Sequence, residues 1–255
     1  GAGVAAAVAV GGRVVWSEGF GLRDLERSLP ATACTRFGLG SISKTLTVAA
    51  ALTLVEEGLL DLDSPVETWI RDFPHAGRGV TLRRIAAHQS GLSDAFASGL
   101  YTTREHFPTI DSAYRGTVAA GLEYEPGSEL RYATGVFTVI AKAMEAATGR
   151  AYTDLVRERV LDPAGMTRTV PNDRTIEIPD RTGFYLRAED GTLGPAPYFD
   201  PSHTLAGAGW LATAADVARL GAALLGSDLL GPRVRAEMFR PVPLADGTPT
   251  EYAPG

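Results

Sequence analysis

A nearly unbroken run of apolar residues extends from Leu46 to Val55 and dominates the hydrophobic pattern of the chain. The run lacks the alternation of a half-buried strand and is too long for an ordinary strand. It therefore predicts a helix of about 15 residues that is buried on most sides. Ser41 and Lys44 stand at the start of this helix, and Gly58 follows it as a left-handed C-cap.

Two apolar segments at the start of the chain, residues 4–10 and 13–19, flank a Gly-Gly pair. A Gly-Gly pair between such segments predicts a β-hairpin. Because two strands alone are not stable in water, the hairpin must extend a larger sheet or lie on helices. A second hairpin is predicted within residues 181–199, with its turn at an Asp-Gly pair.

The rest of the pattern is mostly helical. Cap residues and apolar periodicity predict a short helix that begins at Pro65 and longer helices over residues 81–91, 135–148, 152–161, 213–225 and 232–239. Residues 93–113 are expected to form an irregular surface segment, and residues 204–210 a loop of small residues. Because the strands fall mainly at the start of the chain, the sequence predicts an α+β fold with a helical lobe.

Composition and charge narrow the class of protein. The net charge is −6 and no basic stripe is present, which argues against a nucleic-acid partner. No apolar run is long enough to cross a bilayer without a charge. The single Cys34 allows no internal disulfide and leaves the compartment undetermined. Both ends look cut, because the chain starts at Gly1 in strand-like sequence and stops at Gly255 in a loop-like stretch.

Ser41 and Lys44 carry the first indication of chemistry. They are three residues apart, so a helix places their side chains on one face and within reach of each other. A serine hydroxyl needs an adjacent base to act as a nucleophile, and a lysine can be that base when burial lowers its pKa. Lys44 and Lys142 are the only lysines of the chain, and arginine could not replace a lysine in this role. The alternative is a chance Ser-x-x-Lys pattern with a solvated amine.

The four histidines, His75, His88, His106 and His203, are scattered without the spacing of metal ligands. We therefore expect no metal or organic cofactor. His88 lies at the end of the helix predicted for residues 81–91. It is either a catalytic base or a histidine that bonds local backbone carbonyls, and the second reading is favoured.

Taken in order, four stretches resemble the serine β-lactamase and penicillin-binding-protein-like superfamily. They read GSISK, AAHQSGL, PGSELRYAT and AGAGWLATAADVARL. The resemblance covers essentially the whole chain and preserves order and spacing. It looks closest to the class C-like branch, which includes esterases, D-aminopeptidase-like enzymes and the mitochondrial lactamase-like serine protease.

The resemblance implies a β-lactamase/transpeptidase-like fold, with an antiparallel sheet flanked by helices and a helical lobe. Residues 1–255 would form one incomplete domain. Residues 1–40 and about 200–255 would belong to the sheet-side lobe, and residues 41–200 to the helical lobe. The family's third box, Lys/His-Ser/Thr-Gly on an edge strand, has no match. We expect it to lie beyond Gly255, together with the missing C-terminal sheet strands and the second oxyanion-hole donor.

The same resemblance implies roles for individual residues. Ser41 matches the acylated nucleophile, Lys44 its base or proton shuttle, and Tyr132 the residue that relays a proton to the leaving group. Without the first box of the family, the Ser-x-x-Lys pattern of Ser41 and Lys44, Tyr132 would be interpreted as an aromatic residue at the edge of the core. The second box usually reads Tyr-x-Asn, but Thr134 stands here and offers a hydroxyl instead of an amide. Three residues are expected to contact substrate: Thr134, Gly207 and Gly209.

These residues predict a serine hydrolase that forms an acyl-enzyme on Ser41. It would cleave amide or ester bonds of a small-molecule or peptide substrate. A peptidase or esterase ranks above a true β-lactamase, because Thr134 departs from the lactamase pattern. The alternative is a non-catalytic, lactamase-like binding module or self-associating scaffold, since a fold does not determine a function. The oligomeric state stays open.

Overall fold

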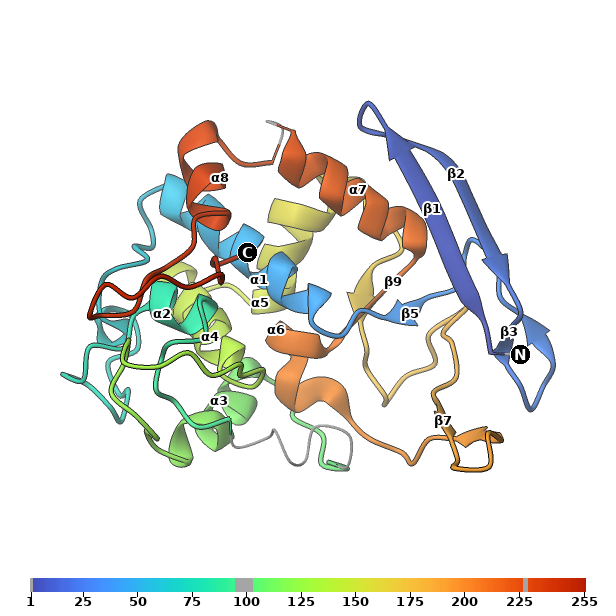
Figure 1. The fold of residues 1–255 in the computed structure, drawn as a ribbon, viewed down its shortest axis with the longest axis horizontal. Coiled ribbons are helices and arrows are strands. Elements are labelled where there is room, and N and C mark those ends of the chain that lie inside the picture. The colour runs from blue at the N-terminus through green and yellow to red at the C-terminus, as the bar shows by residue number, and fades with distance from the viewer. Residues whose placement is uncertain (1, 95–102, 227–228) are drawn as a thin grey trace.

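Helix α1 (Ile42–Glu56) lies at the centre of the fold, with helices on one side and a β-hairpin on the other (Figure 1). A computed structural model describes residues 2–94, 103–226 and 229–255. The helix has the 15 residues that the apolar run predicts. Its leucines and alanines are buried on nearly all sides, and the chain leaves it at Gly58, whose φ is +74°.

Eight α-helices and nine strands are assigned within the described residues. The helices are α1, α2 (Leu82–Ala86), α3 (Ile110–Ala119), α4 (Phe137–Thr148), α5 (Tyr152–Val156), α6 (Leu205–Ala208), α7 (Ala214–Leu225) and α8 (Pro232–Met238). The strands are β1 (Val4–Val10), β2 (Arg13–Phe20), β3 (Leu22–Asp24), β4 (Leu29–Pro30), β5 (Phe37–Gly38), β6 (Val170–Pro171), β7 (Tyr185–Arg187), β8 (Leu193–Pro195) and β9 (Trp210–Ala212). Two short 3-10 helices, Val66–Thr68 and Pro201–Thr204, and a π-helical turn, Arg157–Leu161, complete the assignment. Within these described ranges, no helix is both long and apolar enough to span a membrane.

The helical core surrounds α1, which contacts α4, α5, α6 and α8. Several polar groups inside this core satisfy one another. The Tyr152 hydroxyl lies 2.7 Å from Thr47 Oγ1 and accepts a hydrogen bond of 3.2 Å from Trp210 Nε1. Burial of the phenol raises the pKa of Tyr152 to about 12. Because a buried polar group without a partner costs free energy, this network fixes α5 and β9 against α1.

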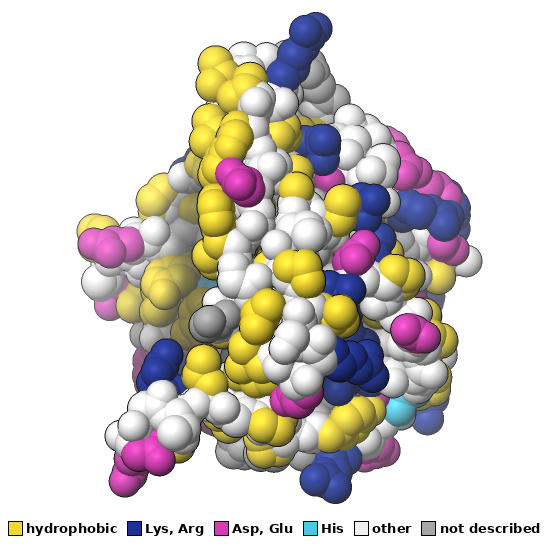
Figure 2. Space-filling view, turned by 90° about the vertical axis from the view of Figure 1, so that its right-hand side faces the viewer, with side chains coloured by type: hydrophobic (Ala, Val, Ile, Leu, Met, Phe, Trp, Pro, Cys, Tyr) yellow, Lys and Arg dark blue, Asp and Glu magenta, His cyan; other side chains and the backbone are white. Residues whose placement is uncertain are grey.

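The predicted N-terminal hairpin is present. Strands β1 and β2 pair antiparallel, with Val8 opposite Trp16. Gly11 and Gly12 at the turn both have positive φ, which the favoured two-residue hairpin turn requires. One face of the hairpin packs against α7. The other face exposes valines and aromatic side chains, and a band of hydrophobic residues follows it (Figure 2).

A three-stranded antiparallel sheet in the order β5-β9-β6 leads the chain into α1. The N–H of Leu39 donates to the carbonyl of Trp210 over 2.8 Å. This bond ties the residues just before Ser41 to the strand that follows α6. The sheet therefore brings the start of α1 and the α6 segment to one place, although they are far apart in the sequence.

The structure corrects three of the expected elements. Residues 110–119 form helix α3 instead of an irregular segment, because Thr109 and Ser112 make a reciprocal capping box. Residues 95–102 of that segment lie outside the described residues. The loop expected over residues 204–210 contains helix α6. The helix expected over residues 81–91 ends at Ala86, because His88 adopts φ +59°.

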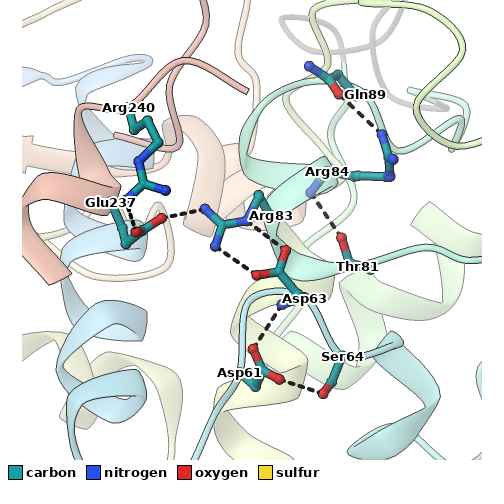
Figure 3. Close-up of polar contacts among 9 residues, drawn as sticks. All are labelled: Asp61, Asp63, Ser64, Thr81, Arg83, Arg84, Gln89, Glu237 and Arg240. Carbon is teal, nitrogen blue, oxygen red and sulfur yellow. Dashed lines mark hydrogen bonds and ion pairs between the residues drawn. The ribbon is translucent and has the colours of Figure 1, made fainter. Parts of the chain in front are cut away.

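Arg83 on α2 joins three parts of the helical side (Figure 3). Its guanidinium donates to both carboxylate oxygens of Asp63 over 2.7 and 2.8 Å and to Glu237 on α8 over 2.9 Å. This hydrogen bonding is the main reason that the pKa of Asp63 lies below its usual value.

Replacing Arg83 with methionine should lower the free energy of unfolding by about 2 kcal/mol, because the partly buried Glu237 and the more exposed Asp63 both lose their hydrogen bonds to the guanidinium. Urea unfolding measures the change. The matched control is Arg78→Met, which breaks an exposed pair with Glu125 and should cost less than about 1 kcal/mol. Equal losses in the two variants would contradict the stabilising role of the Arg83 contacts with Asp63 and Glu237.

Candidate active site

Ser41 and Lys44 meet at the N-terminus of α1, as their spacing predicts. Ser41 is the N-cap residue and is exposed, whereas Lys44 lies one turn further along the helix and is 7 % exposed. Lys44 Nζ is 3.2 Å from Ser41 Oγ. A nucleophile and a base within hydrogen-bond distance are the arrangement that covalent catalysis needs.

The Lys44 amine has two further polar neighbours. Nζ lies 3.1 Å from Thr134 Oγ1 and 3.1 Å from the carbonyl oxygen of Gly207. A neutral amine has two N–H groups and one lone pair. It can donate to Thr134 and Gly207 while its lone pair faces the Ser41 hydroxyl. An ammonium can donate to all three oxygens, so the contacts accommodate both the neutral and the protonated form between which a base cycles.

Burial is the largest influence on the pKa of Lys44 and lowers it below the ordinary value of 10.5. The Tyr132 hydroxyl and the charge of Asp94 oppose this shift. The aromatic rings of Tyr132 and Phe137 also lie 4.8 and 5.3 Å from Nζ and favour the cation. Desolvation outweighs these contacts, so Lys44 loses its proton at lower pH than a solvated lysine.

Tyr132 is the third member of the cluster and contacts Ser41 from outside α1. It lies in the segment before α4, and its hydroxyl donates to Ser41 Oγ over 2.6 Å. Its side chain is 49 % exposed, so the phenol borders both the Ser41 hydroxyl and solvent. The structure thus brings together the three residues that the sequence selected for catalysis: Ser41, Lys44 and Tyr132.

The residues expected to bind substrate separate into two groups. Thr134 and Gly207 are buried against Lys44, so the structure places them where they orient the amine. A Cβ on Gly207 would lie 2.3 Å from the Thr134 carbonyl oxygen, which explains why glycine is needed there. Gly209 bonds elsewhere: its carbonyl accepts a hydrogen bond from the N–H of Asn172 over 2.8 Å, and its N–H donates to the carbonyl of Leu205.

Asp94 holds the segment that carries Tyr132 and was not selected from the sequence. Its carboxylate accepts hydrogen bonds from the N–H groups of Thr134 and Gly135 over 2.6 and 3.0 Å. The contact joins residues 40 positions apart. In the sequence, the one feature that could have pointed to this role is that Asp94 directly follows the Ser-Gly-Leu-Ser stretch.

His88 also lies at this site. Its Nδ1 is 3.2 Å from the N–H of Ala133, and its ring stacks on Tyr132 with centroids 4.2 Å apart. The expectation of a bond to a local backbone carbonyl is therefore wrong, because the ring nitrogen accepts from a distant N–H. Tyr252, near the end of the chain, contacts the His88 ring edge-on.

Acid should destabilise the protein through His88. Burial, and secondarily the charge of Lys44, lowers the pKa of His88 from 6.5 to about 4. The unfolded chain therefore binds this proton at a higher pH than the folded chain. The stability contribution is fully present above pH 6.5 and is lost as the pH falls toward 4.

Between pH 7 and pH 5 this group alone should remove roughly 2 kcal/mol from the free energy of unfolding. Urea titrations at the two pH values measure the loss. The variant His88→Asn does not titrate in this range and should lose correspondingly less. Parallel losses in the parent and the variant would contradict the buried, neutral state of His88.

The fold and the Ser–Lys–Tyr cluster are those that the resemblance leads one to expect. A family model described as Beta-lactamase matches residues 1–254. The chain therefore belongs to the β-lactamase family. The mixed α+β fold agrees with this assignment, because the solved structures that it resembles superpose on it with TM-scores near 0.8.

Several named proteins are similar to the chain. It is 27% identical to the human mitochondrial serine beta-lactamase-like protein LACTB, with 88% of this chain and 53% of that protein aligned. It is 33% identical to a D-aminopeptidase of Brucella anthropi, with 72% of this chain and 35% of that protein aligned. The chain thus spans about half the length, or less, of these curated relatives.

Solved structures give the same fold. An octameric penicillin-binding protein homologue from Pyrococcus abyssi matches 94% of the chain with a TM-score of 0.79 and 27% identity, and 56% of that protein is covered. D-amino acid amidase from Ochrobactrum anthropi SV3, in complex with D-phenylalanine, matches 94% of the chain with a TM-score of 0.83. Its identity is 24%, and 72% of that protein is covered.

Proposed function

We propose that the protein is a serine hydrolase that cleaves amide or ester bonds through an acyl-enzyme on Ser41. One observation carries the proposal. Ser41 Oγ lies between the amine of Lys44 at 3.2 Å and the hydroxyl of Tyr132 at 2.6 Å. A serine flanked by a base and a proton donor has the groups that both halves of an acyl-transfer reaction need.

In acylation, Ser41 Oγ attacks the substrate carbonyl carbon and its proton passes to Lys44 Nζ. Tyr132 donates its proton to the leaving nitrogen or oxygen as the amide or ester bond breaks. In deacylation, the Tyr132 phenolate takes a proton from water, which attacks the acyl carbon. Lys44 then returns its proton to Ser41 Oγ, and all three groups regain their starting state.

The backbone N–H of Ser41 can stabilise the oxyanion of the tetrahedral intermediate. It stands at the N-terminus of α1, where the helix dipole favours negative charge. Among the described residues, none accepts a hydrogen bond from it. An oxyanion donor contributes about 2.7–4 kcal/mol to transition-state stabilisation.

The substrate is proposed to be a peptide or a small ester. The chain is similar to proteins named D-aminopeptidase and Esterase EstB, and Thr134 stands where the lactamase pattern has asparagine. A cavity of about 280 Å³ borders Gly40 and Ala208, with Phe184 and Phe199 on its walls. It has room for one apolar side chain of the acyl group.

A turnover assay tests the proposal. The purified protein is offered short acyl esters, D-amino-acid peptides and a chromogenic cephalosporin. We expect hydrolysis of an ester or peptide that Ser41→Ala abolishes and that Ser128→Ala, a change at an exposed serine, leaves intact. Equal turnover by Ser41→Ala and the parent would contradict the proposal.

A non-catalytic binding or self-associating module is the second candidate. Two observations favour it: Thr134 replaces the asparagine of the second box, and a similar solved protein is octameric. This candidate predicts no turnover of any substrate in the panel, together with a stable oligomer in sedimentation measurements. Turnover that depends on Lys44 would exclude it.

A further inference from the structure

The segment that carries Tyr132 has no strand or helix of its own, and its backbone is held by the segment after α2. The N–H of Arg131 donates to the carbonyl of His88 over 2.9 Å, and the N–H of Ala133 donates to His88 Nδ1 over 3.2 Å. Asp94 accepts the next two N–H groups, those of Thr134 and Gly135. His88 therefore bonds the backbone on both sides of Tyr132.

The imidazole of His88 also contacts the Tyr132 side chain. The two rings are 4.2 Å apart and inclined by 30°, and His88 is 4 % exposed. Phe137 and Tyr252 contact the His88 ring at centroid distances of 5.5 and 5.3 Å. A ring so enclosed has little freedom to turn, so it fixes the plane in which the Tyr132 phenol lies.

We propose that His88 is a positioning residue that holds the Tyr132 hydroxyl at Ser41 through a neutral imidazole with its proton on Nε2. This inference rests on the proposed function. In this tautomer Nδ1 accepts from Ala133 while the ring supports the phenol. His88 contacts the ring of Tyr132, and the Tyr132 hydroxyl contacts Ser41 Oγ. His88 therefore acts on the reaction through Tyr132 and is not a catalytic residue.

Protonation would break this arrangement. A proton on Nδ1 would face the N–H of Ala133 and turn an acceptor into a donor. It would also place a second positive charge near Lys44, which comes from α1. The other titratable groups around His88 are the phenols of Tyr132, Tyr124 and Tyr252. Among the described residues, the charged side chains on the segments bonded to His88 include Asp94, on the same segment as His88, and Arg131, whose guanidinium lies over the Tyr124 ring.

Two substitutions separate the hydrogen bond from the ring stack. His88→Asn keeps an acceptor near the Nδ1 position and tolerates the positive φ of this residue. His88→Phe keeps an aromatic ring and removes the acceptor. Circular dichroism and thermal unfolding establish that each variant is folded at the assay temperature.

For His88→Phe we expect kcat to fall by about 10- to 100-fold with KM changed less than about threefold, because the reacting groups are misplaced while the substrate site remains. His88→Asn should recover at least half of this loss on a logarithmic scale. Full activity of His88→Phe, or an equal loss in both variants, would overturn the inference.

A spectroscopic measurement keeps the test independent of turnover. In ¹⁵N-labelled protein at pH 7, His88 should show an unprotonated Nδ1 and a protonated Nε2, and the signal of Ala133 N–H should shift in His88→Phe. The opposite tautomer would overturn the inference even in an active enzyme. If the parent shows no turnover at all, the proposed function fails, and these spectra still decide whether His88 holds the Tyr132 segment.

Discussion

Replacing Lys44 with arginine is expected to slow the acylation of Ser41 by roughly 10⁴-fold or more. Arginine keeps the positive charge and much of the length of lysine, but it cannot lose its proton in a protein. The Ser41 hydroxyl, 3.2 Å from Lys44 Nζ in the parent, would then have no base. The rate of reaction with an activated fluorophosphonate measures the loss.

The pH dependence of the same reaction gives the control. In the parent, the rate should rise with pH as Lys44 loses its proton, with a midpoint below the ordinary lysine value of 10.5. Lys44→Arg should show no such rise. Lys142→Arg changes the other lysine, which pairs with Asp111 far from Ser41 in the sequence, and should react like the parent. A pH-independent parent rate would contradict the role of Lys44.

Replacing Tyr132 with phenylalanine should lower kcat for amide substrates by about 10²–10⁴-fold. The change removes the hydroxyl 2.6 Å from Ser41 Oγ and leaves the ring on His88. An amine leaving group must gain a proton as it departs, whereas a p-nitrophenolate does not. The loss of acylation rate should therefore be much smaller for p-nitrophenyl esters. Because Tyr132 also serves deacylation, the comparison uses the pre-steady-state burst of p-nitrophenolate and single-turnover cleavage of the amide, which report acylation alone.

Tyr252→Phe is the matched control for this second prediction. Tyr252 is exposed at the same site and contacts His88 with its ring, so removing its hydroxyl should change kcat less than about threefold. The same loss of acylation rate for amides and p-nitrophenyl esters in Tyr132→Phe would show that the phenol does not protonate the leaving group.

Local chemistry made much of the fold predictable. The apolar run gives α1 its length and its burial, and Gly11 and Gly12 give the hairpin its turn. Thr81 and Thr213 accept hydrogen bonds from the backbone at the starts of α2 and α7, as cap residues in the sequence indicate. These features depend on a few neighbouring residues, so the sequence pattern contains them.

The rest depends on contacts between distant segments. Helix α6 follows a 3-10 turn whose start is capped by Asp200, and a run of small residues gives no sign of it. His88 and Asp94 act on residues about 40 positions away, and Tyr252 meets His88 from near the end of the chain. No periodicity or motif records such pairings, because they form only when the helical core assembles.

The candidate active site was predictable only where its residues are close together in the sequence. Ser41 and Lys44 are one helical turn apart, so their meeting follows from α1 alone. Tyr132 comes from 91 positions away, and it was selected only through the family resemblance. The burial of Thr134 and Gly207 against Lys44 could not be read from the sequence, since it depends on how α6 packs on α1.

Peptide mapping of the covalent adduct tests the central claim most directly. The protein is treated with a fluorophosphonate, digested and analysed by mass spectrometry. We expect one adduct on Ser41 that forms faster as the pH rises and disappears in Ser41→Ala. No adduct on the parent, or an adduct that persists in Ser41→Ala, would contradict a nucleophile activated at the start of α1.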